Sequence, residues 1–195
     1  MHVSSKNILT IDPPFLFKTG EIFNDPLFIA YETYGELNDK KDNAILVTTG
    51  LSPSAHLCST SEDQSPGWWE KIAGEGKYID TQKYFVICIN SLGSCYGSSG
   101  PASFKPDTDV KYGLSFPEVT IEDMAQSMKP VIDKLGIKTL HSIIGPSMGG
   151  MTAMSLVKQF PSITKNLILI STAASCRPFS IAVRSLQRKL ITSDQ

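Results

Sequence analysis

Hydrophobic residues along the chain gather in short continuous runs, separated by longer stretches of mixed character. Such runs are too short for amphipathic helices and are typical of strands buried on both faces of a parallel sheet. The sequence therefore predicts strands in five places, which are residues 27–31, 44–47, 84–89, 142–144 and 167–170.

Two segments between these runs have the spacing of an amphipathic helix. The first follows Thr120, where Asp123 completes a capping-box pattern, and contains Pro130, which is expected to kink it. The second begins just after Ser147 and ends before Phe160. This order of strands and helices predicts an α/β fold with a mostly parallel, doubly wound sheet.

Composition narrows the class of protein. A chain of 195 residues, 41% hydrophobic and with a net charge of -1, fits one ordinary globular domain. No basic run indicates nucleic acid or an anionic membrane, so we expect a small-molecule partner. No apolar run approaches the roughly 20 residues that cross a bilayer, and residues 1–6 are polar with no apolar run behind them, so we expect a cytoplasmic protein. The cysteines lack CxxC spacing and are expected to be reduced thiols: Cys58, Cys88, Cys95 and Cys176.

The turn into the second helix carries the candidate chemistry. The sequence from Gly145 to Gly149 fits the G-x-S-x-G nucleophile elbow, in which Ser147 projects its hydroxyl from a sharp strand-to-helix turn. The two glycines would avoid clashes in this turn, and Gly150 would let the helix pack close to the strand. An ordinary Gly/Ser turn is the alternative.

A serine nucleophile also needs donors for the oxyanion. In this type of site, one N–H comes from the residue after the nucleophile, here Met148, and one from the loop after an earlier strand. The run 44–47 leads into a Gly/Ser/Pro turn, so the N–H of Leu51 is the second candidate, with a plain connecting loop as the alternative. We expect no bound metal, because no His/Cys/Asp/Glu cluster has ligand spacing.

Four motifs, in order along nearly the whole chain, resemble the homoserine O-acetyltransferase family of α/β-hydrolase-fold acyltransferases. They are TGLSPSAH (49–56), PGWW (66–69), NSLGSCYGSSGPAS (90–103) and GPSMGGM (145–151). The turn 50–53 and the segment 178–188 are most similar to the serine O-succinyltransferase branch. The resemblance implies an α/β-hydrolase fold of which residues 1–175 are the N-terminal part, residues 176–195 begin a helical lid, and the last strands are absent.

The resemblance also implies an activity: transfer of an acyl group from succinyl-CoA or acetyl-CoA to the hydroxyl of serine or homoserine, in cysteine or methionine biosynthesis. Ser147 would carry the acyl group in a ping-pong mechanism, without a bound cofactor, and the full-length enzyme would be a homodimer. Arg184 would bind a succinyl carboxylate, although Arg184 and Arg188 are alternatively a solvated helix face. A specificity turn would help to select the amino acid; it comprises Ser52, Pro53, Ser54 and Ala55.

The general base is missing from the chain. Triad order in this fold is Ser, then Asp or Glu, then His, yet no histidine follows Ser147 and the one later aspartate is Asp194. His141 lies on the strand before Ser147, about 20 Å away at roughly 3.3 Å per residue. His2 is near the N-terminus, and His56 is expected to be a loop histidine, although it could approach the site.

We therefore expect little or no turnover from the isolated 195 residues. Two other interpretations stay open. One is an esterase or thioesterase on the same fold, because an elbow alone does not select the acyl acceptor. The other is a non-catalytic fragment that pairs with a separate chain.

Trp68 and Trp69 belong to one of the four motifs. We favour a packing interpretation for them, in which both are core residues.

Overall fold

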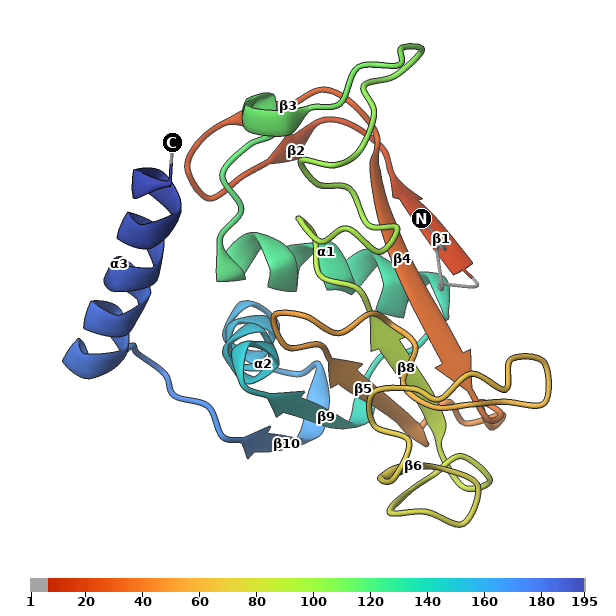
Figure 1. The fold of residues 1–195 in the computed structure, drawn as a ribbon. Helices are drawn as coiled ribbons and strands as arrows, with labels where there is room; N and C mark the ends of the chain where they lie inside the picture. The colour runs from red at the N-terminus through yellow and green to blue at the C-terminus, as the bar shows by residue number, and fades with distance from the viewer. Residues whose placement is uncertain (1–6, 195) are drawn as a thin grey trace.

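A six-stranded mixed sheet organises the chain in the computed structural model, which describes residues 7–194 (Figure 1). Its strands, in spatial order, are β1 (Asn7–Ile11), β4 (Leu27–Tyr34), β8 (Phe85–Ile89), β5 (Ala44–Thr48), β9 (Leu140–Pro146) and β10 (Thr164–Ile170). Strands β8, β5, β9 and β10 are parallel, whereas β1 pairs antiparallel with β4 and β4 antiparallel with β8. The predicted α/β fold with a mostly parallel sheet is confirmed.

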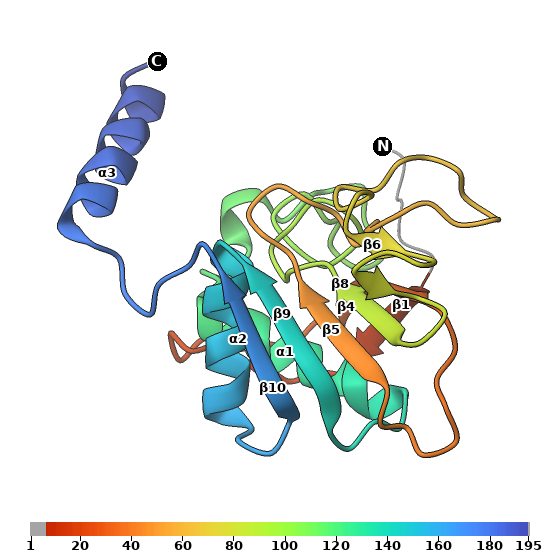
Figure 2. The same ribbon diagram turned by 90° about the horizontal axis from the view of Figure 1, so that it is seen from below.

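Each face of the sheet has its own hydrophobic cluster, because successive side chains of a strand point to opposite faces. On one face Ile87 and Ile89 pack with α1 (Ile121–Lys134) and α2 (Met148–Gln159). On the other face Val86 packs against residues from the segment 51–84, whose strands β6 (Ala73–Gly74) and β7 (Ile79–Asp80) are very short (Figure 2). The second layer of the doubly wound sheet is thus largely irregular.

All five predicted strands are present, but one is in the wrong environment. The run 167–170 was expected to be buried on both faces; as part of β10 it is largely exposed, with Ile168 45% exposed. The reason is position, since in the described part of the chain β10 is the outermost strand and pairs only with β9. Central strands β5 and β8 are fully buried, as predicted.

Both predicted helices are also confirmed. The helix α1 begins after Thr120 with both bonds of the capping box, because Thr120 and Asp123 each accept from the other's backbone N–H. Pro130 lies inside this helix. The helix α2 begins directly after Ser147 and ends before Phe160.

Several elements were not predicted. They are the antiparallel edge strand β1, the hairpin of β2 (Phe15–Leu16) and β3 (Ile22–Phe23), and the short helix η1 (Gly113–Ser115). Beyond the end of β8, part of β4 has no neighbouring strand on that side in the portion that the structure describes. Serine hydroxyls of the loop 91–117 accept hydrogen bonds from this part of β4 instead. Ser98 accepts from the N–H of Ala30 and Ser99 from that of Phe28.

The last helix, α3 (Pro178–Ser193), stands apart from the sheet in both overall views (Figures 1 and 2). It contains no buried residue, and apolar side chains such as Phe179 and Leu190 are exposed. Within residues 7–194, no helix combines the length and apolar character needed to cross a bilayer.

The cysteines agree with their predicted state, since all four are free thiols.

Candidate functional site

Ser147 occupies a strained backbone conformation at the junction of β9 and α2. Its φ is 53° and its ψ is -124°, a left-handed region that serine rarely adopts. The backbone N–H donates to the carbonyl of Ile170 at 2.9 Å, which ties the turn to β10. The side chain is exposed and makes no capping hydrogen bond, so the hydroxyl is available at the N-terminus of α2.

The glycines around Ser147 are required by close backbone contacts. A Cβ on Gly149 would lie 2.4 Å from the carbonyl oxygen of Thr48, and one on Gly145 would lie 2.6 Å from the α-carbon of Gly150. Gly150 itself lies against the side chain of Thr172, where a Cβ would approach to 2.4 Å. These distances are shorter than any ordinary contact, so the G-x-S-x-G spacing follows from packing as well as from the turn.

The structure brings the turn after β5 against the elbow. The hydroxyl of Thr48 donates to the carbonyl of Gly149 at 2.8 Å, and a Cβ on Gly50 would lie 4.0 Å from the carbonyl oxygen of Pro146. The two segments that hold the candidate oxyanion donors, Leu51 and Met148, are therefore neighbours. Leu51 is 70% exposed, so its N–H belongs to an accessible part of the turn.

The segment after Leu51 becomes progressively buried. Ser52 is exposed, Pro53 and Ser54 are half-buried, and Ala55 is fully buried. The indole N–H of Trp68 donates to the carbonyl of Ser54 at 3.0 Å. Trp68 and Trp69 stack on each other and pack against the second hydrophobic cluster, as the packing interpretation predicted.

Neither described histidine contacts Ser147. His56 is buried, and its ring bonds to Glu32 and to the carbonyl of Ser65. His141 lies near the start of β9, whereas Ser147 comes after its end, and its Nδ1 lies 2.8 Å from the hydroxyl of Ser142. His2 lies outside the described residues. Sequence reasoning missed Glu32, and its position directly after the apolar run 27–31 was the available signal.

Arg184 lies on α3 and is exposed. Its guanidinium donates to the side chain of Gln187 one turn further along, at 3.0 Å. Among the described residues, no hydrogen bond or ion pair joins Arg184 to the elbow or to the specificity turn. Arg184 thus lies on an exposed face of α3 in this structure, and its role in acyl selection stays a prediction. Asp194 caps the end of the same helix and is also exposed.

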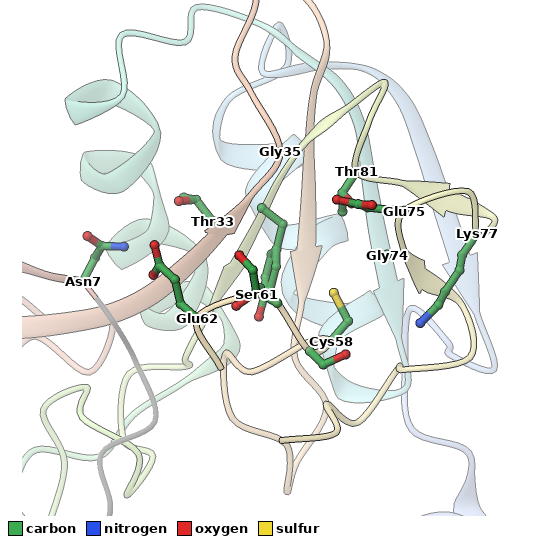
Figure 3. A pocket seen from close by; sticks show the side chains of 13 residues that line it. Asn7, Thr33, Gly35, Cys58, Ser61, Glu62, Gly74, Glu75, Lys77 and Thr81 are labelled. Carbon is green, nitrogen blue, oxygen red and sulfur yellow. The ribbon is translucent and has the colours of Figure 1, made fainter. Parts of the chain in front are cut away.

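A hollow of about 820 Å³ lies elsewhere, between the end of β4, the loop 58–62 and the segment 74–81 that contains β7 (Figure 3). Tyr34, at the end of β4, pairs with Val86 near the start of β8, so the hollow is at the amino ends of the parallel strands, opposite the elbow. The thiol of Cys58 lines it, but burial raises its pKa to about 11, which keeps it protonated and unreactive. Across residues 7–194, no cluster of His, Cys, Asp and Glu is arranged to hold a metal ion.

Comparisons with known proteins converge on one kind of fold. The family model described as "alpha/beta hydrolase fold" matches residues 43–188. A serine O-succinyltransferase from Xanthomonas axonopodis pv. citri (strain 306) is 51% identical over 181 residues, which are 93% of this chain and 45% of that protein. An L-serine/homoserine O-acetyltransferase from Streptomyces lavendulae is 54% identical over 166 residues, covering 85% of this chain and 44% of that protein.

Solved structures agree with these relatives. The esterase E22 structure superposes with a TM-score of 0.85 at 34% identity, covering 97% of this chain and 53% of that one. A homoserine O-acetyltransferase from Bacillus anthracis superposes with a TM-score of 0.80 at 32% identity, covering 92% of this chain and 49% of that one. The chain thus spans about half the length of the proteins it matches.

Proposed function

The chain belongs to the alpha/beta hydrolase fold family, and from this premise we propose that it carries the nucleophile of an amino-acid O-acyltransferase. The conformation of Ser147 is the observation that carries the proposal. An exposed serine with a φ of 53° between a buried strand and a helix, packed between obligatory glycines, is the arrangement in which this fold presents a nucleophile. The names of two relatives support serine or homoserine as the acyl acceptor.

The chemistry has two halves. In the first, the hydroxyl oxygen of Ser147 attacks the thioester carbonyl of acyl-CoA, and the N–H groups of Leu51 and Met148 stabilise the oxyanion. The C–S bond breaks, the CoA thiol leaves with a proton, and the acyl group stays on Ser147 as an ester. In the second, the hydroxyl of the amino acid attacks this ester and Ser147 regains its proton. Acyl-CoA is a co-substrate here, and the O-acylated amino acid would serve cysteine or methionine synthesis.

Proton transfer limits what residues 7–194 can do alone. A base must take the proton from Ser147, and neither His56 nor His141 contacts it. We therefore predict slow turnover, at most, for the 195-residue chain by itself. Arg184 remains the proposed binding residue for the succinyl carboxylate. The specificity turn Ser52–Ala55 remains the proposed site that selects the amino acid.

Intact-mass measurement after incubation with succinyl-CoA or acetyl-CoA tests the proposal. The assay uses two proteins: the 195-residue chain, and the same chain joined to the part of the Xanthomonas axonopodis relative that lies beyond the matched region. We expect the joined protein to gain the mass of one acyl group, and the Ser147→Ala variant to gain none. Adding L-serine or L-homoserine should remove the group and release an O-acyl amino acid. If neither protein is acylated at Ser147, the proposal is wrong.

An esterase is the second candidate, and the superposition on esterase E22 favours it specifically. Both reactions pass through the same acyl-serine, and they differ in whether water or an amino acid receives the acyl group. The product separates them: free acid at an unchanged rate when the amino acid is added indicates an esterase, whereas O-acyl amino acid indicates a transferase.

A further inference from the structure

A buried polar cluster lies beside the segment that comes after the specificity turn. Glu32 and Tyr34 are on β4, two residues apart and so on the same face, and they are 2% and 5% exposed. His56, the residue after the turn's last member, is 7% exposed and contacts Glu32. A carboxylate in this environment is costly unless its charge is compensated.

Hydrogen-bond geometry constrains the protons of His56. Its Nε2 lies 2.9 Å from the carbonyl oxygen of Ser65, which can only accept. The hydroxyl of Ser65 is 3.2 Å from Nε2 but donates to Asp63, so Nε2 carries a proton. The other ring nitrogen, Nδ1, lies 3.1 Å from Oε2 of Glu32. A carboxylate at this place would only accept, so Nδ1 would donate as well and the ring would be an imidazolium, whereas a protonated Glu32 would donate to a neutral ring. The nitrogen spectra described below separate these two arrangements.

The surrounding groups agree with the imidazolium. Burial by itself lowers the pKa of His56, but the hydrogen bond to Ser65 and the contacts with Glu32 and Asp63 outweigh it, and the pKa is raised. The cysteines that face the cluster, Cys58 and Cys88, have pKa values raised by burial and stay neutral. Within the described chain, Oε1 of Glu32 has no hydrogen-bond partner, so the imidazolium is the main compensation for this carboxylate.

Tyr34 connects the ion pair to the turn. Its hydroxyl donates to Oε2 of Glu32 at 2.7 Å and accepts from the backbone N–H of Leu57 at 2.8 Å. The carbonyl oxygen of Ala55 lies 3.2 Å from the same hydroxyl. Two consecutive contacts, at His56 and Leu57, therefore fasten the chain to β4 immediately after the specificity turn.

At its other end the same segment adjoins the elbow, through Gly50 and Pro146. A loss of the contacts with β4 would thus leave one end of the turn to the hydrogen bonds that Trp68 and Trp69 donate to residues 54, 56 and 57. Thr48 and Gly50 would still hold the other end beside Ser147. We propose that Glu32, Tyr34 and His56 are positioning residues, which hold the turn Ser52–Ala55 in place through a buried carboxylate–imidazolium pair. The consequence for acceptor binding rests on the proposed function.

Hydrogen exchange and nitrogen NMR of the 195-residue protein test the positioning directly. We expect Glu32→Gln and Tyr34→Phe to speed exchange of the backbone amides at residues 54–57 by about tenfold or more, the worth of one charge-linked hydrogen bond. Tyr112→Phe is the matched control, because that hydroxyl donates to the carboxylate of Asp25 in another part of the chain. It should leave these amides unchanged.

In the nitrogen spectra, both ring nitrogens of His56 should be protonated near neutral pH, and Glu32→Gln should remove this signature. A His56 ring with one bare nitrogen in the unmodified protein, or unchanged exchange at residues 54–57 in both variants, would overturn the proposal. These measurements need no turnover, so they decide it even if no acyl transfer is found and the proposed function fails.

Kinetics of the joined protein distinguish positioning from a general structural effect. We expect Glu32→Gln and Tyr34→Phe to raise KM for the amino acid by about tenfold, while acylation of Ser147 by acyl-CoA keeps its rate. The reason is that the acceptor enters only in the second half-reaction. Equal losses in both half-reactions, or an unchanged KM, would contradict a role in acceptor positioning.

Discussion

Strands β9 and β10 are parallel neighbours with similarly apolar sequences, yet they differ in burial and in the segment that each one leads into. Ile144 of β9 is 7% exposed, whereas its register partner Ile168 of β10 is 45% exposed. Each strand is followed by a serine with a positive φ, 53° at Ser147 and 48° at Ser171. From there the chain continues into a packed helix after β9, but through a largely exposed link to α3, which has no buried residue, after β10. Sequence hydrophobicity alone therefore does not tell a core strand from an edge strand; the number of neighbours does.

The largest expected effect comes from the matched pair Ile144→Ala and Ile168→Ala. The first removes buried methyl groups from the second hydrophobic cluster and should lower the free energy of unfolding by about 2–4 kcal/mol. The second removes half-exposed atoms and should cost less than about 1 kcal/mol. Chemical denaturation of both variants checks the difference, and equal losses would mean that the face of β10 is covered in solution.

A smaller loss is expected for Gly149→Ala. Its Cβ would meet the carbonyl oxygen of Thr48 at 2.4 Å, so β5 and α2 must separate, at about 1–3 kcal/mol. Gly50→Ala is the control, because a Cβ there meets nothing closer than 3.8 Å. Thermal or denaturant unfolding measures both, and a Gly149→Ala variant as stable as the parent would show that the elbow is looser than its contacts indicate.

Ser147→Gly should stabilise the protein, by about 1 kcal/mol, because glycine adopts a positive φ without strain. Ser147→Ala keeps the strain and should leave the free energy of unfolding nearly unchanged. Both variants lack the nucleophile, so the difference between their denaturation midpoints measures how much the backbone strain at position 147 destabilises the protein. A glycine variant no more stable than the alanine variant would place the strain elsewhere.

The smallest effect on the free energy of unfolding is expected from removing the helix that follows β10. Removing residues 177–195 deletes α3, which has no buried side chain, so the free energy of unfolding should change by less than about 0.5 kcal/mol. The circular dichroism of the shortened chain should lose helical signal without a shift in the unfolding midpoint. A clear shift would show that α3 packs against the rest of the chain in solution.

The sequence predicted the parts of the fold whose signals are local. The capping box at Thr120 joins residues three positions apart, so it can be recognised in the sequence. The glycines around Ser147 also form a short motif with fixed spacing, although the contacts that require Gly149 and Gly150 come from the distant residues Thr48 and Thr172. The exposure of Ile168 could not be, since it depends on which strand ends up outermost.

At the candidate site, the elbow was likewise visible, while the partners of His56 were not. The contact between His56 and Glu32 spans 24 positions and requires the strand order to be known first. The same holds for Ser98 and Ser99, whose bonds to β4 span 68 and 71 positions. The motif 90–103 contains both serines, but it does not indicate their partners on β4.

The hydroxyl of Thr48 sets a dimension of the proposed oxyanion hole. Its hydrogen bond to the carbonyl of Gly149, 2.8 Å long, links the end of β5 to the first turn of α2. The two proposed donors, Leu51 and Met148, each lie close in sequence to one partner in that bond. In the proposed oxyanion hole, the width available to a charged oxygen would thus depend on Thr48, a residue that is fully buried inside the sheet. A change at Thr48 would alter the fit while leaving both donors in place.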